Sequence, residues 1–426
     1  MSKTVAKKTK KSKFAAALLL FLALFAAFLL VLKSGAFQSS EIIQNSAAAI
    51  SASSSSPAIT HISTPDPVKG VYMTSCVASS PSMREQEVNL IDKTELNTVI
   101  IDGKTYNGYI AFPTDDKLLA KNVGGPCFVK DMPAFIKELH EKGIYVVVRL
   151  ATFQDPLMVS EHPEVAVTSK KSGLPWQDQN HITWIDAGSE VYWQYIAEVA
   201  KTAYAIGFDE VNFDYIRYPS DGEMSDISYP ASSFLFSKGE SKSDVIEKFS
   251  KYLSDNLRSA GITISADVFG QTTQQKDDMG IGQIFEKFLP YFDYVSPMIY
   301  PSLYTYNYDN LGDPNNHPYK IVKFATDSAV TRAQATTTIF ETLDSTIVST
   351  STPILYSKPS FDIKKVRPWL QDNNYPVTYT PQMVRDQIQA DYDSGLDSWM
   401  LWNAGNIYSR DALMPYPTSS STARVL

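Results

Sequence analysis

Two aspartates of this chain lie inside apolar runs, where a carboxylate is not expected. Asp214 lies in the aromatic run EVNFDYI (210–216), and Asp267 interrupts the apolar run ITISADV (262–268). A carboxylate in such surroundings is costly unless it is paired. Two carboxyl groups in unlike environments can divide into a proton donor and an ionised partner, as glycoside hydrolysis requires. We therefore predict that Asp214 acts as nucleophile or charge stabiliser and that Asp267 acts as acid/base.

Both aspartates also have structural interpretations. Asp214 could form a salt bridge with Arg217, and Asp267 could cap the turn that follows its apolar run. Asp102 and Asp372 also follow apolar runs, so they stay in reserve as alternative acids. Several carboxylates that converge on one site repel one another, which raises the pKa of some and leaves others ionised beside a cation.

Further residues are predicted to bind or orient a substrate because they too end apolar runs. An arginine stays protonated at any relevant pH, so the basic residues of this group bind rather than react. The aromatic members suit the apolar faces of pyranose rings, although a buried tryptophan is also a common core residue. The predicted binding residues are Asp102, Lys104, Arg149, Arg217, Tyr300, Trp369, Asp372, Trp402 and Asn403.

Other chemistries find little support in the sequence. It contains no G-x-S-x-G, H-E-x-x-H or Walker motif, and its 5 histidines and 2 cysteines show no zinc spacing. We therefore predict no metal site and no cofactor. The net charge of −8 argues against a nucleic acid partner, since phosphates select clustered Lys and Arg. Cys76 and Cys127 could form one disulfide in an oxidising compartment or remain two buried thiols.

Short apolar runs alternate with amphipathic stretches along most of the chain, as expected of consecutive βα units. This pattern predicts a (β/α)8 TIM barrel, in which the active site lies at the carboxyl ends of the strands. A doubly wound open sheet would alternate in the same way, but it usually carries a Gly-rich phosphate loop that this sequence lacks. The eight predicted strands are residues 69–75, 97–102, 144–150, 210–216, 262–268, 294–300, 366–371 and 398–403.

The N-terminal segment has the pattern of a membrane anchor. Lysines between residues 3 and 13 precede an uninterrupted apolar run from Phe14 to Leu32, which is about the length that crosses a bilayer core. Because the lysines should stay in the cytoplasm, the rest of the chain is expected outside the membrane, or secreted if the segment is a cleaved signal peptide. We predict a basic segment and transmembrane helix at 1–33, a Ser-rich disordered linker at 34–66, the barrel at 67–413 and a disordered tail at 414–426.

A series of motifs resembles one bacterial family of inferred glycoside hydrolases, domain of unknown function 4015. The motifs are KGVYMTS, TELNTVIIDGK, GIYVVVRLATFQD, GFDEVNFDYIRYPSDG, ISADVFG, FDYVSPMIYP, RPWLQD and SWMLWNAGNIY. The resemblance covers nearly all of residues 67–413 and implies an alpha-glycosidase-like TIM barrel. It also implies that Asp214 occupies the strand-four carboxylate position, which is the nucleophile in related barrels, and that Asp267 ends the next strand.

These observations favour an extracytoplasmic glycoside hydrolase that acts on a cell-envelope or extracellular polysaccharide or oligosaccharide. A barrel tethered by a flexible stalk could reach glycans near its membrane. Two alternatives remain open. One is a non-catalytic glycan-binding or scaffold protein at the cell surface, and the other is a polysaccharide deacetylase or another metal hydrolase.

Overall fold

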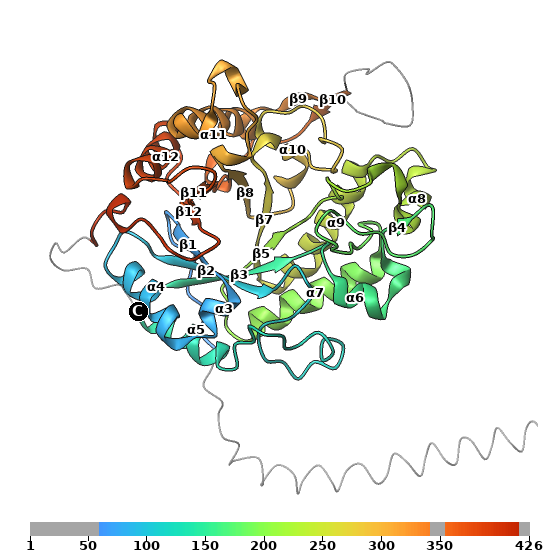
Figure 1. Cartoon of the computed structure of the whole chain (residues 1–426), viewed down its shortest axis with the longest axis horizontal. Coiled ribbons are helices and arrows are strands. Elements are labelled where there is room, and N and C mark those ends of the chain that lie inside the picture. Colours follow the sequence, from blue (N-terminus) through green and yellow to red (C-terminus); the bar gives the residue numbers. More distant parts are fainter. Residues whose placement is uncertain (1–58, 341–353, 417–426) are drawn as a thin grey trace, which may run out of the picture. The chain divides into compact units, whose positions relative to one another are not determined.

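The computed structural model describes residues 59–340 and 354–416 of the chain. In this part of the chain, eight parallel strands form a closed barrel in which the first strand pairs with both the second and the last (Figure 1). The order around the barrel is β1, β2, β3, β5, β7, β8, β11, β12. The strands are β1 (Lys69–Met73), β2 (Thr98–Lys104), β3 (Tyr145–Ala151), β5 (Glu210–Asp214), β7 (Thr263–Phe269), β8 (Tyr294–Ile299), β11 (Trp369–Gln371) and β12 (Trp399–Trp402).

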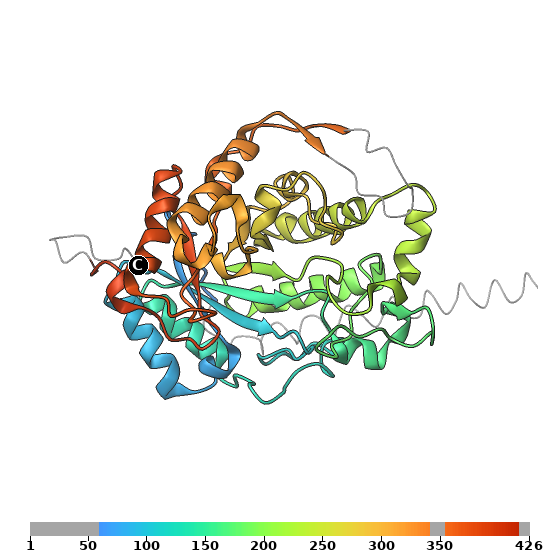
Figure 2. The same cartoon turned by 45° about the horizontal axis from the view of Figure 1, so that its top comes forward.

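Helices surround the barrel (Figures 1 and 2). The apolar side chains of its strands are largely buried. Strands that are covered on both faces are rich in apolar residues, as in the fully buried β3, YVVVRLA. The longer helices are α4 (Pro81–Asp92), α5 (Met132–Glu141), α7 (Glu190–Ala205), α9 (Lys242–Leu257), α11 (Pro318–Gln334) and α12 (Pro381–Asp393). Shorter ones are α3 (Ser75–Ala78), α6 (Pro156–Glu161), α8 (Pro230–Phe236) and α10 (Phe285–Phe288).

Helix α9 illustrates how the local sequence sets these elements. Ser241 and Asp244 form a reciprocal capping box at its start, which satisfies backbone N–H groups that have no partner inside the helix. Its buried apolar residues recur every three or four positions and make one face against the barrel. They are Val245, Ile246, Phe249, Leu253 and Leu257.

Two small antiparallel sheets lie outside the barrel. β9 (Thr337–Phe340) pairs with β10 (Ile354–Ser357). β4 (Thr168–Ser169) pairs with β6 (Ile227–Ser228), and this pair joins the long loop after β3 to the loop after β5. The hydroxyl of Ser169 also donates to Asp226 at 2.6 Å. The two loops are therefore held together beyond the carboxyl ends of their strands.

The barrel prediction is confirmed, and the alternative of an open sheet is wrong because the sheet closes on itself. Each predicted strand is present, and most strand ends differ from the prediction by one or two residues. The seventh strand begins only at Trp369, since Pro368 has no N–H to donate, although Val366 bridges to Val295 before it. Cys76 and Cys127 form a disulfide, so the alternative of two free thiols is wrong.

The predicted transmembrane helix, most of the linker and most of the tail lie outside the described residues. Within residues 59–340 and 354–416, no helix is long and apolar enough to cross a membrane. The last eight residues of the predicted linker, 59–66, lie against the barrel instead of forming a disordered stretch. Specific hydrogen bonds hold this segment against the barrel. The backbone N–H of Ile62 donates to Asp209 at 2.9 Å, and the hydroxyls of Thr64 and Tyr145 are 2.9 Å apart.

Candidate active site

Arg149 lies at the centre of a cluster of three aspartates at the carboxyl ends of neighbouring strands. Its guanidinium donates to Asp102 of β2 at 2.7 Å and to Asp214 of β5, and its Nε lies 3.8 Å from Asp267 of β7. The strand register explains the convergence, because Asp102 pairs directly with Arg149 and Asp214 pairs with Ala151. One buried cation therefore serves three buried carboxyl groups.

Asp214 is held by donors on both of its oxygens. Arg149 donates to Oδ2, and the backbone N–H of Tyr215 donates to Oδ1 at 2.5 Å. Tyr215 itself adopts a left-handed conformation with φ of 55°, which is uncommon for a residue with a side chain. One charged donor and one backbone donor therefore fix the orientation of the Asp214 carboxyl group.

Asp267 has a different environment. Its Oδ1 accepts from Asn212 Nδ2 at 2.9 Å and from Trp369 Nε1 at 2.8 Å, and the residue is only 1% exposed. Burial, followed by repulsion from Asp214, raises the pKa of Asp267 to about 8, although Arg149 and the two donors oppose this rise. This rise in pKa favours the protonated form of Asp267. Oδ1 accepts both hydrogen bonds, and Oδ2 is the oxygen that lies 3.8 Å from Arg149 Nε.

Asp102 completes the cluster from the opposite side of the guanidinium. Its Oδ2 accepts a hydrogen bond from the Tyr72 hydroxyl at 2.5 Å. Burial raises the pKa of Asp102, while Arg149 and the Tyr72 hydroxyl lower it. Asp102 thus helps to hold Arg149 in place, and Asp214 and Asp267 are the aspartates of the cluster that line the cleft described next.

The Asp214 cleft is a concavity of about 290 Å³ into which both carboxyl groups open. Its walls combine polar and aromatic side chains, as small-molecule sites commonly do. Its lining residues from the predicted set are Arg149, Asp214, Arg217, Asp267, Tyr300, Trp369 and Trp402. The structure thus brings seven of the eleven predicted site residues to one cleft and places Asp102 directly behind it.

Arg217 pairs with no carboxylate by a direct ion pair among the described residues, so the predicted alternative of an Asp214 to Arg217 salt bridge is wrong. Its guanidinium carbon lies 4.8 Å from the ring centre of Trp184 and 4.9 Å from that of Phe269. It also donates to the carbonyl oxygen of Tyr218 at 3.1 Å. Stacking between two aromatic rings holds Arg217 rigidly in the wall of the cleft.

Lys104 lies away from the cleft, in contrast to its predicted role in substrate binding. The side chain is fully buried, and its Nζ lies 3.0 Å from Asp155 Oδ2 and 2.7 Å from the carbonyl oxygen of Ala151. The register of β2 on β3 shifts between Asp102 and Lys104, which breaks the alternation that would place both on one face. A Cβ at the intervening Gly103 would lie 2.2 Å from Val148, so only glycine fits this shift.

Asp372 and Asn403 also lie outside the cleft and have structural partners. Asp372 accepts from the backbone N–H and the hydroxyl of Ser409, each at 2.7 Å, and burial raises its pKa to about 6. Asn403 donates to the carbonyl oxygens of Asp372 at 2.5 Å and of Ile407 at 2.6 Å. The two residues therefore position the loop after β12 and do not line the cleft.

Sequence reasoning missed Tyr72 and Asn212, which donate to two of the three aspartates. A usable signal existed for Asn212. It precedes Asp214 by two positions in β5, and alternate residues of a strand share a face, so both point into the barrel. For Tyr72 the signal is weaker, because a tyrosine in an apolar strand is common in cores.

A family model described as "Putative glycosyl hydrolase domain" matches residues 70–408. The chain belongs to this family. The family was expected from the sequence motifs, and the match confirms it. No curated protein sequence matches the chain.

Solved structures similar to this chain include the PgaB (BpsB) glycoside hydrolase domain from Bordetella bronchiseptica. It has 12% sequence identity, a TM-score of 0.55, and covers 79% of this chain and 94% of its own. A hypothetical protein from Ruminiclostridium thermocellum ATCC 27405 is 31% identical over 46% of this chain and 97% of its own, with a TM-score of 0.41. At 12% identity, the likeness to the Bordetella domain shows a shared barrel fold.

Proposed function

We propose that this protein is a glycoside hydrolase in which Asp267 is the general acid and Asp214 is the nucleophile. The observation that supports this most is the unlike state of two carboxyl groups beside one guanidinium: Asp267 is buried with its pKa raised to about 8, whereas Asp214 is held by Arg149 and a backbone N–H. Two carboxyl groups in such unlike environments are typical of an acid and a nucleophile.

In the proposed reaction, Asp267 transfers its proton to the glycosidic oxygen as the bond from that oxygen to the anomeric carbon breaks. Asp214 attacks the anomeric carbon and forms a glycosyl-enzyme intermediate. Water then cleaves this intermediate after giving a proton back to Asp267, so the anomeric configuration is retained. In this proposal the Asp214 carboxylate also stabilises the positive charge that develops on the sugar in the transition state.

The aromatic wall of the Asp214 cleft supports a carbohydrate substrate. Trp402 is partly exposed, and its ring lies 6.3 Å from that of Tyr300 and 4.2 Å from that of Tyr72. Neighbouring rings of this kind hold one another in place and leave a flat apolar surface for a pyranose ring. A cell-envelope or extracellular polysaccharide is the proposed source of that sugar.

We further propose that the barrel acts outside the cytoplasm. The disulfide between Cys76 and Cys127 supports this, because Cys76 is exposed and exposed disulfides persist mainly in oxidising compartments. The lysine-rich start and the apolar run 14–32 of the sequence support a membrane anchor. Fractionation of cells, followed by protease treatment of intact cells, tests both points. A protein recovered in the soluble cytoplasmic fraction would contradict them.

The enzymatic proposal is tested with the purified full-length chain in detergent. It should release reducing ends from isolated envelope glycans, and Asp214→Asn and Asp267→Asn should each lower the rate by roughly 10²–10⁴-fold. Asp255→Asn, an exposed aspartate outside the cleft, serves as the matched control. Circular dichroism verifies folding of each variant. Proton NMR of the first product identifies its anomer, and an inverted product would contradict the role of Asp214 as nucleophile.

The test also separates the proposed enzyme from a non-catalytic glycan-binding protein. If the wild type binds a glycan without turnover and both asparagine variants bind it equally well, the protein is a binding barrel. Equal turnover by the wild type and both variants would contradict the roles of the two aspartates.

A further inference from the structure

A second cleft adjoins the Asp214 cleft and has no assigned role. It has a volume of about 460 Å³, within the range of ligand-binding clefts. We name it the Tyr106 cleft, after the exposed residue on its rim. Arg149, Tyr215 and Trp402 line both clefts, so the two concavities meet at a shared wall. The other residues that line the Tyr106 cleft are Tyr72, Thr74, Ser75, Cys76, Asp102, Thr105, Tyr106, Asn107, Tyr109, Ala111, Gly124, Pro126, Cys127 and Ala404.

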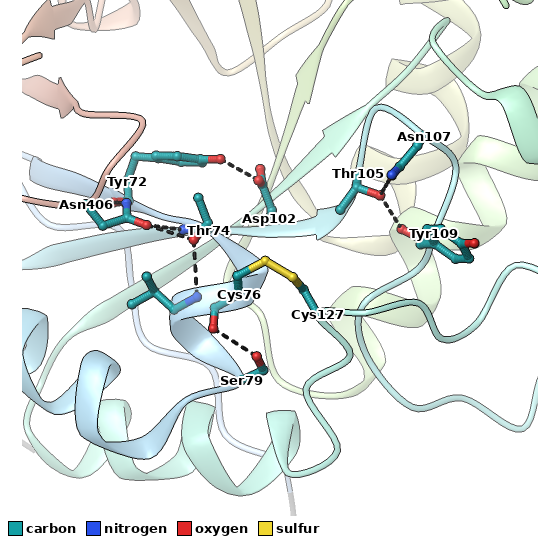
Figure 3. Close-up of a disulfide and its surroundings, with 11 residues drawn as sticks. Tyr72, Thr74, Cys76, Ser79, Asp102, Thr105, Asn107, Tyr109, Cys127 and Asn406 are labelled. Carbon is teal, nitrogen blue, oxygen red and sulfur yellow. Dashed lines mark hydrogen bonds between the residues drawn. A yellow bond between two sulfur atoms is a disulfide. The ribbon is translucent and has the colours of Figure 1, made fainter. Parts of the chain in front are cut away.

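The loop after β2 forms one wall of the Tyr106 cleft and is held in a defined shape. The Thr105 hydroxyl donates to the Asn107 side chain at 2.5 Å and to the Tyr109 carbonyl oxygen at 3.3 Å (Figure 3). The Thr105 N–H donates to the same carbonyl oxygen at 2.9 Å. Gly125 packs against the ring of Tyr109, where a Cβ would lie only 2.6 Å from the ring. This wall is thus preorganised, which lowers the entropy cost of binding a ligand.

The disulfide forms part of the same wall. Cys76 and Cys127 both line the Tyr106 cleft, and their bond ties the start of α3 to the far end of the loop after β2 (Figure 3). At the base of α3, the Asn406 side chain accepts from the Thr74 hydroxyl at 2.8 Å. The loops that follow β1, β2 and β12 are therefore fastened together around this cleft.

The lining chemistry indicates what the Tyr106 cleft can bind. The charged residues of its lining are Asp102 and Arg149, and the guanidinium of Arg149 donates to Asp102 at 2.7 Å as well as to Asp214. The rest of the lining offers tyrosine rings, hydroxyl groups and an amide. Tyr106 is 52% exposed, and among the described residues it has no ring or hydrogen-bond partner. An exposed aromatic ring above neutral hydroxyl and amide groups suits an uncharged sugar ring.

We propose that the Tyr106 cleft binds further sugar units of the chain whose bond is cleaved in the Asp214 cleft. The protein would then bind a polysaccharide across its catalytic pair and cut internal linkages. This inference rests on the proposed glycosidase function for the cleavage, but the binding of sugar by the Tyr106 cleft can be measured without it. The shared wall supports this proposal. A sugar chain bound beside Arg149 and Trp402 in the Asp214 cleft can extend directly into the Tyr106 cleft.

The decisive variant is Tyr106→Ala, with Tyr306→Ala as the matched control. Tyr306 is 80% exposed and lies outside the linings of both clefts, so its removal reports any general effect of losing a surface tyrosine. The probes are ladders of chito-, cello- and malto-oligosaccharides, together with the glycan fraction of the cell envelope. Calorimetry measures their binding, and mass spectrometry measures the size of early products.

We expect Tyr106→Ala to weaken binding of the longer chains by roughly five- to tenfold, with disaccharides and the control unchanged. Early products of the wild type should be oligosaccharides of mixed length. If Tyr106→Ala equals the control at every chain length, or if the wild type releases units only from chain ends, the inference is overturned while the glycosidase function stands. If binding depends on Tyr106 and no glycan is cleaved, the glycosidase function fails and the binding site stands. Failure to bind or cleave any probe would overturn both.

Discussion

The hydrogen bond from Trp369 to Asp267 controls the pH range in which the proposed general acid holds its proton. Trp369 Nε1 donates to Asp267 Oδ1 at 2.8 Å, and this bond favours the ionised carboxylate. Trp369→Phe removes the donor and keeps an aromatic ring in the barrel interior. The neutral acid form of Asp267 is then lost only at higher pH, so the pKa of Asp267 should rise above its value of about 8.

The size of this rise follows from the difference in strength between a hydrogen bond to the ionised carboxylate and one to the neutral carboxylic acid. A hydrogen bond to a charged acceptor contributes about 1 kcal/mol more than one to a neutral acceptor. One pKa unit corresponds to about 1.4 kcal/mol, so the pKa of Asp267 should rise by roughly 0.7 units. The basic limb of kcat/KM against pH, which reports the acid in the free enzyme, should move upward by the same amount.

Trp402→Phe is the matched control for this measurement. Trp402 also lines the Asp214 cleft and packs edge-on against Trp369 with ring centres 6.2 Å apart, but its hydrogen bonds do not reach Asp267. Both variants are expected to bind substrate more weakly, whereas only Trp369→Phe should move the basic limb. A limb that stays in place or moves to lower pH in Trp369→Phe would refute Asp267 as the group whose proton is needed.

Three further predictions concern stability. Glu87 is buried, both of its oxygens lack a partner among the described residues, and burial raises its pKa to about 9. Because the pKa of Glu87 is raised in the folded state, its contribution to stability falls as pH rises from about 4.5 to about 9. Glu87→Met should therefore raise the free energy of unfolding by about 1–3 kcal/mol at pH 8 and by less at pH 5. Urea unfolding at the two pH values measures this difference. Lys104→Met should cost about 3–5 kcal/mol, because it leaves Asp155 buried without its cation; an unchanged stability with a raised KM would instead favour substrate binding by Lys104. Replacing Cys76 and Cys127 by serine should cost about 4 kcal/mol, from the chain entropy of a loop with a sequence separation of 51, and equal urea midpoints with and without the disulfide would contradict this.

Most of the barrel could be predicted because its strands are covered on both faces. Buried parallel strands leave short apolar runs in the sequence, and their carboxyl ends mark where functional side chains gather. The rule selected Asp214 and Asp267 because both stand near the ends of such runs, and the structure brings the two residues to one cleft. It also selected Arg149, at a point where an apolar strand would otherwise continue.

The partners of these residues could not be predicted, because they depend on the register between strands. Asp214 pairs with Arg149, 65 positions earlier, and not with the nearby Arg217. The direct pairing of Asp214 with Ala151 places the Arg149 side chain within reach, and no local pattern records that pairing. Lys104 was misplaced for a similar reason, since the shift at Gly103 has no signal other than the glycine itself.

The Tyr106 cleft was also beyond prediction, because irregular loops build it. The loop after β2 acquires its shape from the disulfide and from single hydrogen bonds, which have no sequence period. The two cysteines could be counted in the sequence, but their distance in space could not.

Arg149 is the cation that links the three aspartates of the site. Asp102, Asp214 and Asp267 are three buried carboxyl groups, and three negative charges so close together could not persist beside the single charge of Arg149. Asp102 and Asp214 accept hydrogen bonds directly from the guanidinium, whereas Asp267 lies 3.8 Å from its Nε and has a raised pKa. In the proposed mechanism, Arg149 therefore does more than bind a substrate: its geometry distinguishes the proposed acid, Asp267, from the proposed nucleophile, Asp214.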